Sequence, residues 1–372
     1  MPYLTYKRKE EQEKKVDWMD LILNTEITEK GRIDPTGTIT RFVEKVNPRI
    51  LAKTNFHRIE MSFYDFTKKH ENLFAAKRED LYHTFYIPKH SGGLRRIDEP
   101  NSELMSALRE LKDLLAENGL YHTSAFAYIK GRSIINALQK HQRNESNWYL
   151  KTDFSNFFGS INLGFTMRML KMIYPYSELS VVGFDYLTKA LELGFLNDGL
   201  PQGTCLSPFL TNLIMIPIDF RIFNDLTERR YVYTRYADDF IISCKQSFKF
   251  TEMVKYIDGV LEEFGAPFRI KPSKTRYGSR NGQNWNLGLM INNKNEITVG
   301  HQKKKQFKAM MNNFILDYKN DKQWDVEDVQ AFAGLLSYYR MVEEDYFKYL
   351  IAHYNEKYKV NFEAMIKRAL YN

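Results

Sequence analysis

One short stretch of the chain, from Tyr231 to Cys244, constrains the fold more than any other. Two runs rich in β-branched and aromatic residues, YVYTRY and FIISC, flank the adjacent pair Asp238 and Asp239. Such runs predict two β-strands, and the acidic pair lies where a tight hairpin turn would join them. Neighbours in a regular strand point to opposite faces, so both carboxylates reach one site only if the backbone turns between or beside them. The sequence therefore predicts a hairpin that presents two acidic side chains together.

A third acidic residue, Asp153, ends an apolar run in YLKTDFSNFFGSI. We expect it beside the hairpin if the two segments pair in one sheet. Crowded carboxylates repel one another unless a cation neutralises them, and a hard divalent ion such as Mg²⁺ is the natural partner. Three such carboxylates suit two-metal phosphoryl transfer, in which one ion activates a hydroxyl and the other holds the leaving pyrophosphate. For the Asp-Asp pair alone, the alternative is an ordinary solvated turn.

Before Asp153 the pattern predicts helices and one hairpin. Apolar residues recur at helical spacing in Asp17–Leu23 and Ile39–Val46, within a helical region of residues 1–80. Two β-prone runs in LYHTFYIPKHSGGLRRIDEP surround Gly92 and predict a hairpin with a basic loop. A helix is expected to follow through Leu104 to Leu115.

From about residue 147 to 245, predicted strands and helices alternate, which indicates an α+β catalytic region. WYLKTDF predicts a strand, Gly164 to Ile173 a helix, and a further helix should follow Ser207-Pro208. Beyond Gly300 a helical C-terminal part is predicted, because apolar residues recur there at helical spacing. These residues are Phe307, Met310, Met311, Phe314, Ile315 and Tyr318.

Composition indicates a globular protein with a polyanionic partner. Hydrophobic residues make up 43% of the chain. The net charge is +8, and the lysines and arginines that produce it are interleaved with acidic residues along the chain rather than gathered in a tail. Mild basicity is also common in proteins that bind no nucleic acid. Cys205 and Cys244 lack metal-ligand spacing, so neither a zinc site nor a disulfide framework is expected. The N-terminus has no apolar signal core, and the apolar run Leu206–Ile218 is too short to span a membrane, so we expect a cytoplasmic protein without a membrane partner.

The ordered set of motifs resembles the palm region of reverse transcriptases, in particular the bacterial retron, group II intron-like and phage-defence-associated lineage. It covers about residues 85–340 through IPKHSGGLRRI, AFAYIKGRS, KTDFSNFFGSI, LPQGTCLSP, YADDF, KPSKT, NLGL and AGLLSYYR. YADD alone is a weak signal, whereas the ordered set is specific. The resemblance implies a right-hand polymerase with an antiparallel palm sheet. Its parts would be a helical N-terminal extension (1–80), fingers (81–146), palm (147–299) and helical thumb (300–372).

Carried onto this chain, the resemblance implies that Asp153 and Asp238 ligate two Mg²⁺ ions, for which Mn²⁺ could substitute. Phe154 would add its backbone carbonyl, and Asp239 would complete the catalytic acidic set. Phe158, five places after Asp153, matches the aromatic steric gate that clashes with a ribose 2′-hydroxyl and so favours dNTPs. Without the motif, an ordinary core phenylalanine would be the better interpretation of Phe158.

Six other positions match residues of the family that contact the incoming dNTP: Lys89, Arg95, Arg96, Gln202, Gly203 and Lys274. The three basic residues of the hairpin would grip the triphosphate, where positive charge offsets charge that develops during transfer. The Gln-Gly pair would lie against the base and the primer, with the glycine allowing close approach. The last lysine is a candidate general acid for the pyrophosphate. The alternatives are a solvated hairpin, an ordinary loop and a surface lysine.

The resemblance also implies contacts with nucleic acid at Arg132, Leu287, Gly288, Lys303, Lys304 and Lys308. The Leu-Gly pair resembles the primer-grip turn, and the three lysines would face the phosphate backbone from the first thumb helix. A solvated helix face is the alternative for these lysines.

The implied function is an RNA-directed DNA polymerase that adds dNTPs to a primer 3′-hydroxyl. It would copy a dedicated non-coding RNA in a retron-like or other antiphage defence system, with an effector protein as a further partner. Two alternatives stay open: a template-independent or protein-primed DNA polymerase of the abortive-infection type, and a catalytically silent RNA-binding scaffold. Asn156 stands where many relatives carry a second acidic residue, and Asn136-Ala137 is followed by His141 rather than by the closer histidine of many retron enzymes.

Overall fold

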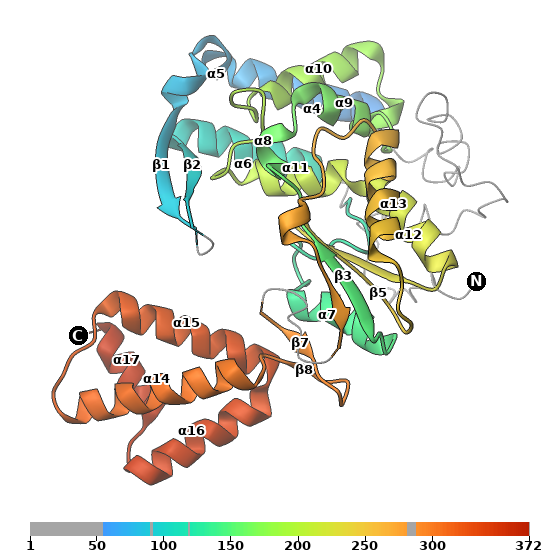
Figure 1. The fold of residues 1–372 in the computed structure, drawn as a ribbon. Helices are drawn as coiled ribbons and strands as arrows, with labels where there is room; N and C mark the ends of the chain where they lie inside the picture. The colour runs from blue at the N-terminus through green and yellow to red at the C-terminus, as the bar shows by residue number, and fades with distance from the viewer. Residues whose placement is uncertain (1–54, 90–91, 118–119, 281–287, 372) are drawn as a thin grey trace. The chain divides into compact units, whose positions relative to one another are not determined.

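The computed structural model describes residues 55–371, apart from 90–91, 118–119 and 281–287 (Figure 1). The helices expected at Asp17–Leu23 and Ile39–Val46 lie outside the described residues, as does Leu287. The chain divides into two compact units, each of which packs mainly within itself. Unit 1 holds the described residues up to 132 together with 152–242 and 249–276, and unit 2 holds 133–151, 243–248 and those from 277 onward. The fingers, palm and thumb boundaries stay a prediction.

The predicted basic hairpin is present in unit 1. Strands β1 (Tyr82–Pro88) and β2 (Leu94–Pro100) pair antiparallel, with Pro88 opposite Leu94. Gly92 has a φ of +85° in the connecting turn, a conformation that a side chain would disfavour. The helix expected next is α6 (Ser102–Ala116), which begins after Asn101, whose side chain accepts a hydrogen bond from the Leu104 N–H.

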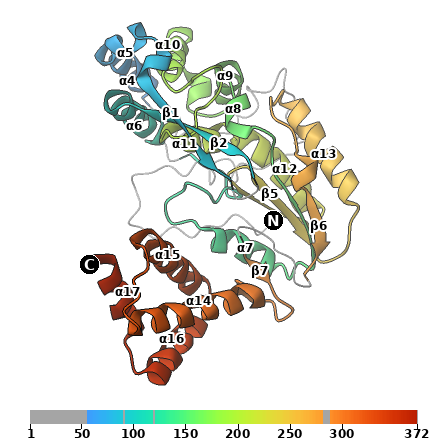
Figure 2. The same ribbon diagram turned by 60° about the vertical axis from the view of Figure 1, so that its left-hand side comes forward.

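Helices make up most of the rest of unit 1. They are α4 (Phe56–Lys69), α5 (Glu71–Ala75), α8 (Phe157–Ser160), α9 (Leu163–Leu170), α10 (Val181–Glu192), α11 (Leu206–Ile214), α12 (Ile216–Glu228) and α13 (Phe250–Glu263), with short 3₁₀ turns at Arg78–Leu81, Tyr176–Glu178 and Pro272–Lys274. Helix α10 packs along α4, and α12 packs on α13 (Figures 1 and 2). Helix α12 also packs on strand β4. The helix expected to reach Ile173 ends at Leu170, where the chain tightens: the N–H groups of Met172 and Ile173 donate to carbonyls three residues earlier, as helix ends often do.

A four-stranded sheet carries the predicted acidic hairpin. Its strand order is β4 (Val232–Tyr236), β5 (Asp239–Cys244), β3 (Trp148–Thr152) and β6 (Arg276–Ser279). Only two residues join β4 to β5, which confirms the predicted hairpin, because so short a connection requires antiparallel strands. The Asn147 N–H donates to the carbonyl of Cys244 at 2.9 Å. In an antiparallel pair, each step forward on one strand is matched by one step back on the other. Six steps from the Asn147–Cys244 pair therefore bring Asp153 opposite Asp238.

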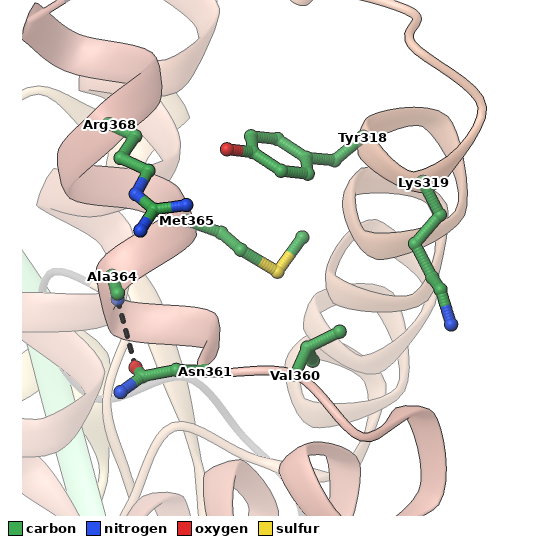
Figure 3. Close-up of a pocket in the computed structure, with 7 residues that line it drawn as sticks. All are labelled: Tyr318, Lys319, Val360, Asn361, Ala364, Met365 and Arg368. Atoms are coloured by element: carbon green, nitrogen blue, oxygen red, sulfur yellow. Dashed lines mark hydrogen bonds between the residues drawn. The ribbon is translucent and has the colours of Figure 1, made fainter.

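Unit 2 contains the predicted C-terminal helices, coloured orange to red in Figure 1. They are α14 (His301–Lys319), α15 (Val326–Val342), α16 (Glu344–Tyr358) and α17 (Phe362–Tyr371); the unit also holds α7 (Ile134–Arg143), β7 (Met290–Ile291) and β8 (Ile297–Thr298). Buried aromatic rings form their core: Phe307, Phe314, Phe332, Phe347 and Phe362. A pocket of about 380 Å³ lies between the end of α14 and α17, with Tyr318, Lys319 and Arg368 on its wall (Figure 3).

Within the described part of the chain, no single helix has the length and apolar character needed to cross a membrane. One helix pair, Leu206–Ile214 with Ile216–Glu228, meets that criterion jointly on length and composition alone, with a bend of 46° between the two helices.

Candidate active site

The three acidic residues are brought together within unit 1. Asp153 directly follows β3 and is 5% exposed, Asp238 lies in the β4–β5 turn, and Asp239 is the first residue of β5. Beneath them the ring of Phe154 packs at 4.6 Å from that of Phe240 and at 4.7 Å from that of Phe268, measured between ring centroids. Phe154 and Phe240 directly follow Asp153 and Asp239 in the chain, so this buried cluster anchors the backbone beside two of the carboxylates.

The carboxylates are electrostatically crowded. Burial, then the neighbouring Asp153 and Asp239, raise the pKa of Asp238 to about 7. One oxygen of Asp153 forms an ion pair with Lys274 Nζ. Among the described residues, the other oxygen of Asp153, Oδ1, is buried without a hydrogen-bond partner. A bound divalent cation would satisfy that oxygen and remove the repulsion.

The donor set fits a metal that also binds the substrate. No group of three or more His, Cys, Asp or Glu side chains, within the part of the chain that the structure describes, is arranged to hold a metal by itself. Mg²⁺ in polymerase sites commonly binds through one or two carboxylates and completes its shell with phosphates and water. Asp153 and Asp238 match that arrangement. The Asp153 carbonyl accepts from the N–H of residue 271, and the Ser155 N–H donates to the carbonyl of residue 269. Because successive carbonyls of a strand point to opposite sides, the carbonyl of Phe154 points away from residues 269–271.

A buried network that no sequence motif marks holds the catalytic turn. Arg235, in β4, is 0% exposed and donates from Nη2 to Asp219 at 2.7 Å, from Nη1 to Asn212 at 3.0 Å and from Nη1 to the carbonyl of Ala237 at 3.1 Å. The Tyr233 hydroxyl donates to the same Asp219 at 2.7 Å. Ala237 has a φ of +58°, so the Arg235 bond fixes an unusual backbone conformation directly before Asp238.

The only signal for this network in the sequence is a basic residue inside an apolar strand, YVYTRY. A buried arginine requires a partner, but its carboxylate is 16 residues earlier, on α12. Nothing in the spacing identifies Asp219 as that partner.

A second segment runs beside β4. Ala125 and Arg235 form a parallel bridge, in which the Phe126 N–H donates to the Arg235 carbonyl at 2.9 Å. Arg132, expected to contact nucleic acid, donates from Nη1 to the carbonyls of His122 and Ala125 at 2.7 and 2.6 Å. Its guanidinium also lies 4.4 Å from the centroid of the Tyr121 ring. In this structure Arg132 therefore holds the loop together, and its contact with nucleic acid stays a prediction.

The two arginines of the basic hairpin point to opposite faces. Arg95 is opposite Ile87 and Arg96 opposite Tyr86, and neighbouring strand residues face opposite sides. Arg96 donates to the buried Asp98 at 2.7 Å, so its charge is compensated within the hairpin. Arg95 lies on the side of Tyr128, a residue close to Asp238. Of the two, Arg96 is the one paired within the hairpin, and the contact of either arginine with a triphosphate stays a prediction.

The loop with Gln202 and Gly203 packs against β2. The Asp98 N–H donates to the Gln202 carbonyl at 2.7 Å, and a Cβ on Gly203 would lie 2.5 Å from the Asp98 carbonyl oxygen. Glycine is therefore required here by contact with the protein's own hairpin. Phe158, in α8, is half-buried, and its carbonyl accepts from Leu200 at 3.0 Å. The steric-gate candidate and this loop are thus adjacent.

The predicted lysines differ in what they contact. Lys303 donates to the carbonyl of Gly288 at 2.8 Å, and burial lowers its pKa. Lys304 pairs with Glu343, and its Nζ lies 4.2 Å from the centroid of the Tyr346 ring. Lys308 is exposed. Its Nζ lies 5.8 Å from the centroid of the Tyr346 ring. All three lysines expected to face a phosphate backbone therefore have a contact within unit 2, and that of Lys308 is the longest.

Comparison with known proteins agrees with the sequence motifs. The family model described as reverse transcriptase (RNA-dependent DNA polymerase) matches residues 87–323. Retron Ec83 reverse transcriptase of Escherichia coli is 24% identical over 76% of this chain and 90% of that protein. Retron Mx65 reverse transcriptase of Myxococcus xanthus is 26% identical over 71% of this chain and 62% of that protein. Among solved structures, telomerase from Candida albicans aligns with a TM-score of 0.43 and 13% identity over 77% of this chain and 63% of that one.

Proposed function

The chain belongs to the reverse transcriptase family of RNA-directed DNA polymerases, and we propose that it extends a primer 3′-hydroxyl at Asp153, Asp238 and Asp239. Its fold is the right-hand polymerase type, with an antiparallel catalytic sheet among helices. One observation carries the proposal: the register of β3 against β5 places Asp153 opposite Asp238, with an unpartnered carboxylate oxygen between crowded acids in the described site.

We propose that Asp153 and Asp238 hold the catalytic ions and that the Phe154 carbonyl adds a ligand. Two Mg²⁺ ions, or Mn²⁺ in their place, would supply the Lewis acidity for attack of the 3′-hydroxyl on the α-phosphate and for release of pyrophosphate. Lys274, which forms an ion pair with Asp153, would donate a proton to the leaving group. Arg95 would offset the triphosphate charge.

Three residues would select and orient the dNTP. Phe158 would clash with a ribose 2′-hydroxyl, and the neighbouring Gln202 and Gly203 would face the base. This division of work is supported by the packing of their loop against both α8 and β2.

We further propose that the template is a dedicated non-coding RNA and that the enzyme acts in a retron-like antiphage system with an effector protein. The support is that both relatives named above are retron reverse transcriptases. The cytoplasmic location stays a prediction.

The test is to purify the protein from its native operon with bound nucleic acid, add labelled dNTPs and Mg²⁺, and sequence RNA and product. A discrete co-purified RNA copied into DNA is the expected result. Asp238→Asn should abolish synthesis while RNA binding persists, and Asp185→Asn, at an exposed position on α10, is the matched control. DNA unrelated to any RNA and attached to protein would instead indicate the protein-primed alternative. No synthesis by the wild type with RNA still bound would indicate the scaffold.

A further inference from the structure

Tyr128 combines three properties that rarely occur together. It is 57% exposed although the four residues before it are buried, and its φ is +60°. A bulky residue in this left-handed region is an outlier, because its Cβ crowds the backbone there. Such outliers persist where the surrounding structure enforces them, and they cluster at functional sites.

The backbone before Tyr128 is held from several directions. Ala125 forms its parallel bridge with Arg235, and the Asn212 side chain donates to the Ala127 carbonyl at 2.7 Å. The same Asn212 side chain accepts from Nη1 of Arg235, which also donates to the carbonyl of Ala237, so the carbonyls directly before Tyr128 and Asp238 are held by one hydrogen-bond network. The buried anchors thus direct an exposed ring to the edge of the catalytic carboxylates.

The surroundings of the ring are those of a substrate-facing side chain. Partial burial, then Asp238 and Tyr236, raise the pKa of the Tyr128 phenol, and Arg95 opposes them. At 57% exposure, the Tyr128 side chain keeps much of its surface open to a ligand. The groups around it are a catalytic acid and a cation proposed to meet the triphosphate.

We infer that the Tyr128 ring is a stacking platform for the nucleobase at the primer terminus. The inference rests on the proposed function, since a 3′-hydroxyl attacking at Asp153 and Asp238 places the terminal base pair beside this ring. Stacking on an aromatic side chain suits any base, because each has a π-face. It would orient the terminus without reading sequence, as copying requires.

If Tyr128 had only a structural role, removing its ring would lower the stability of the protein. An exposed ring contributes little to a core, and glycine would suit the φ of this position better. The wild-type residue therefore lowers stability, and a substrate contact explains its presence. Tyr128→Gly separates the two roles, since it relieves the backbone while deleting the ring.

The probe is an RNA template with a DNA primer that carries 2-aminopurine at its 3′ end, mixed with Mg²⁺ but no dNTP. Wild type should quench the fluorescence by stacking, and Tyr128→Ala should lose most of that quenching and raise the KM for primer–template about tenfold. Tyr128→Phe and Tyr128→Trp should retain both. Tyr128→Gly should behave as the alanine variant in binding yet raise the Tm by about 1–3 °C.

Two controls match the two features of this residue. Tyr371→Ala removes an 81% exposed ring outside the site, and Asp321→Gly relieves another left-handed residue, with a φ of +56°. Neither should change quenching. Unchanged quenching and KM in Tyr128→Ala, equal damage in Tyr128→Phe, or a lowered Tm in Tyr128→Gly would each overturn the inference. If the wild type makes DNA and the Tyr128 variants bind primer–template as the wild type does, only this inference is refuted. If the wild type makes no DNA, the proposed function is refuted.

Discussion

Arg235 allows stability and catalysis to be separated by mutation. Arg235→Leu leaves Asp219 buried at 0% exposure without its cation. Breaking a buried ion pair by removing one partner typically costs about 3–5 kcal/mol, because the remaining charge is uncompensated. The Tyr233 hydroxyl, at 2.7 Å from Asp219, is retained and offsets part of this loss. We therefore expect the free energy of unfolding to fall by about 3 kcal/mol.

The double variant Arg235→Leu with Asp219→Leu should regain most of that stability, since a buried ion pair replaced by apolar side chains is often neutral. It should not regain activity. The carbonyl of Ala237 would still lack the 3.1 Å bond from Arg235 that holds the turn before Asp238. We expect kcat to fall at least about tenfold in both variants, with the KM for dNTP much less affected, because the loss is in catalytic geometry.

Urea unfolding and steady-state primer extension measure the two effects separately. Arg109→Leu, at an exposed position on α6, is the control and should change stability by less than about 0.5 kcal/mol. If the double variant recovered kcat together with stability, Arg235 would serve only to neutralise Asp219, and its positioning of the turn would be refuted.

Three other substitutions test separate parts of the structure. Phe158→Ala should increase incorporation of ribonucleotides relative to dNTPs in competition assays, and unchanged selectivity would contradict the steric-gate assignment. Gly203→Ala should raise the KM for dNTP and lower stability by about 1–3 kcal/mol, because its Cβ would meet the Asp98 carbonyl at 2.5 Å and its φ is +134°; wild-type values would contradict the close packing. Burial lowers the pKa of His141 to about 3, because the folded state favours the neutral ring. The folded state therefore keeps its full stability above the ordinary histidine pKa near 6.5 and loses stability as the pH falls toward about 3. Between pH 7.5 and 5 this amounts to about 2 kcal/mol, and urea unfolding of His141→Gln should show a pH dependence smaller by that amount, whereas an equal dependence would contradict it.

The sequence predicts the catalytic sheet well because its evidence is local. The aromatic runs beside Asp238 predict strands, and the two residues between them require a hairpin. The position of Asp153 at the end of its own apolar strand then limits where it can pair. The same reasoning predicts the basic hairpin from the glycine turn, which the structure confirms.

The remaining features depend on contacts between distant segments. Hairpin register, and not composition, separates Arg95 from Arg96 and pairs the latter with Asp98. Likewise, helical spacing places Lys303 and Lys304 on the first helix of the C-terminal bundle, but only folding brings Glu343 to the second of them. A basic residue in a nucleic-acid enzyme is therefore ambiguous until its partners within the chain are known.

Arg235 also links the catalytic turn to the proposed stacking residue. Its side chain holds the Ala237 carbonyl, while its backbone exchanges hydrogen bonds with Ser124 and Phe126, at 2.7 and 2.9 Å. The segment that places Tyr128 and the turn that places Asp238 are thus fixed by one residue. Movement of the turn in Arg235→Leu should therefore also weaken 2-aminopurine quenching, whereas Tyr128→Ala should leave the turn in place. If quenching in Arg235→Leu matched the wild type while kcat fell, the two sites would be independent, and the bridge at Arg235 would have no role in aligning them.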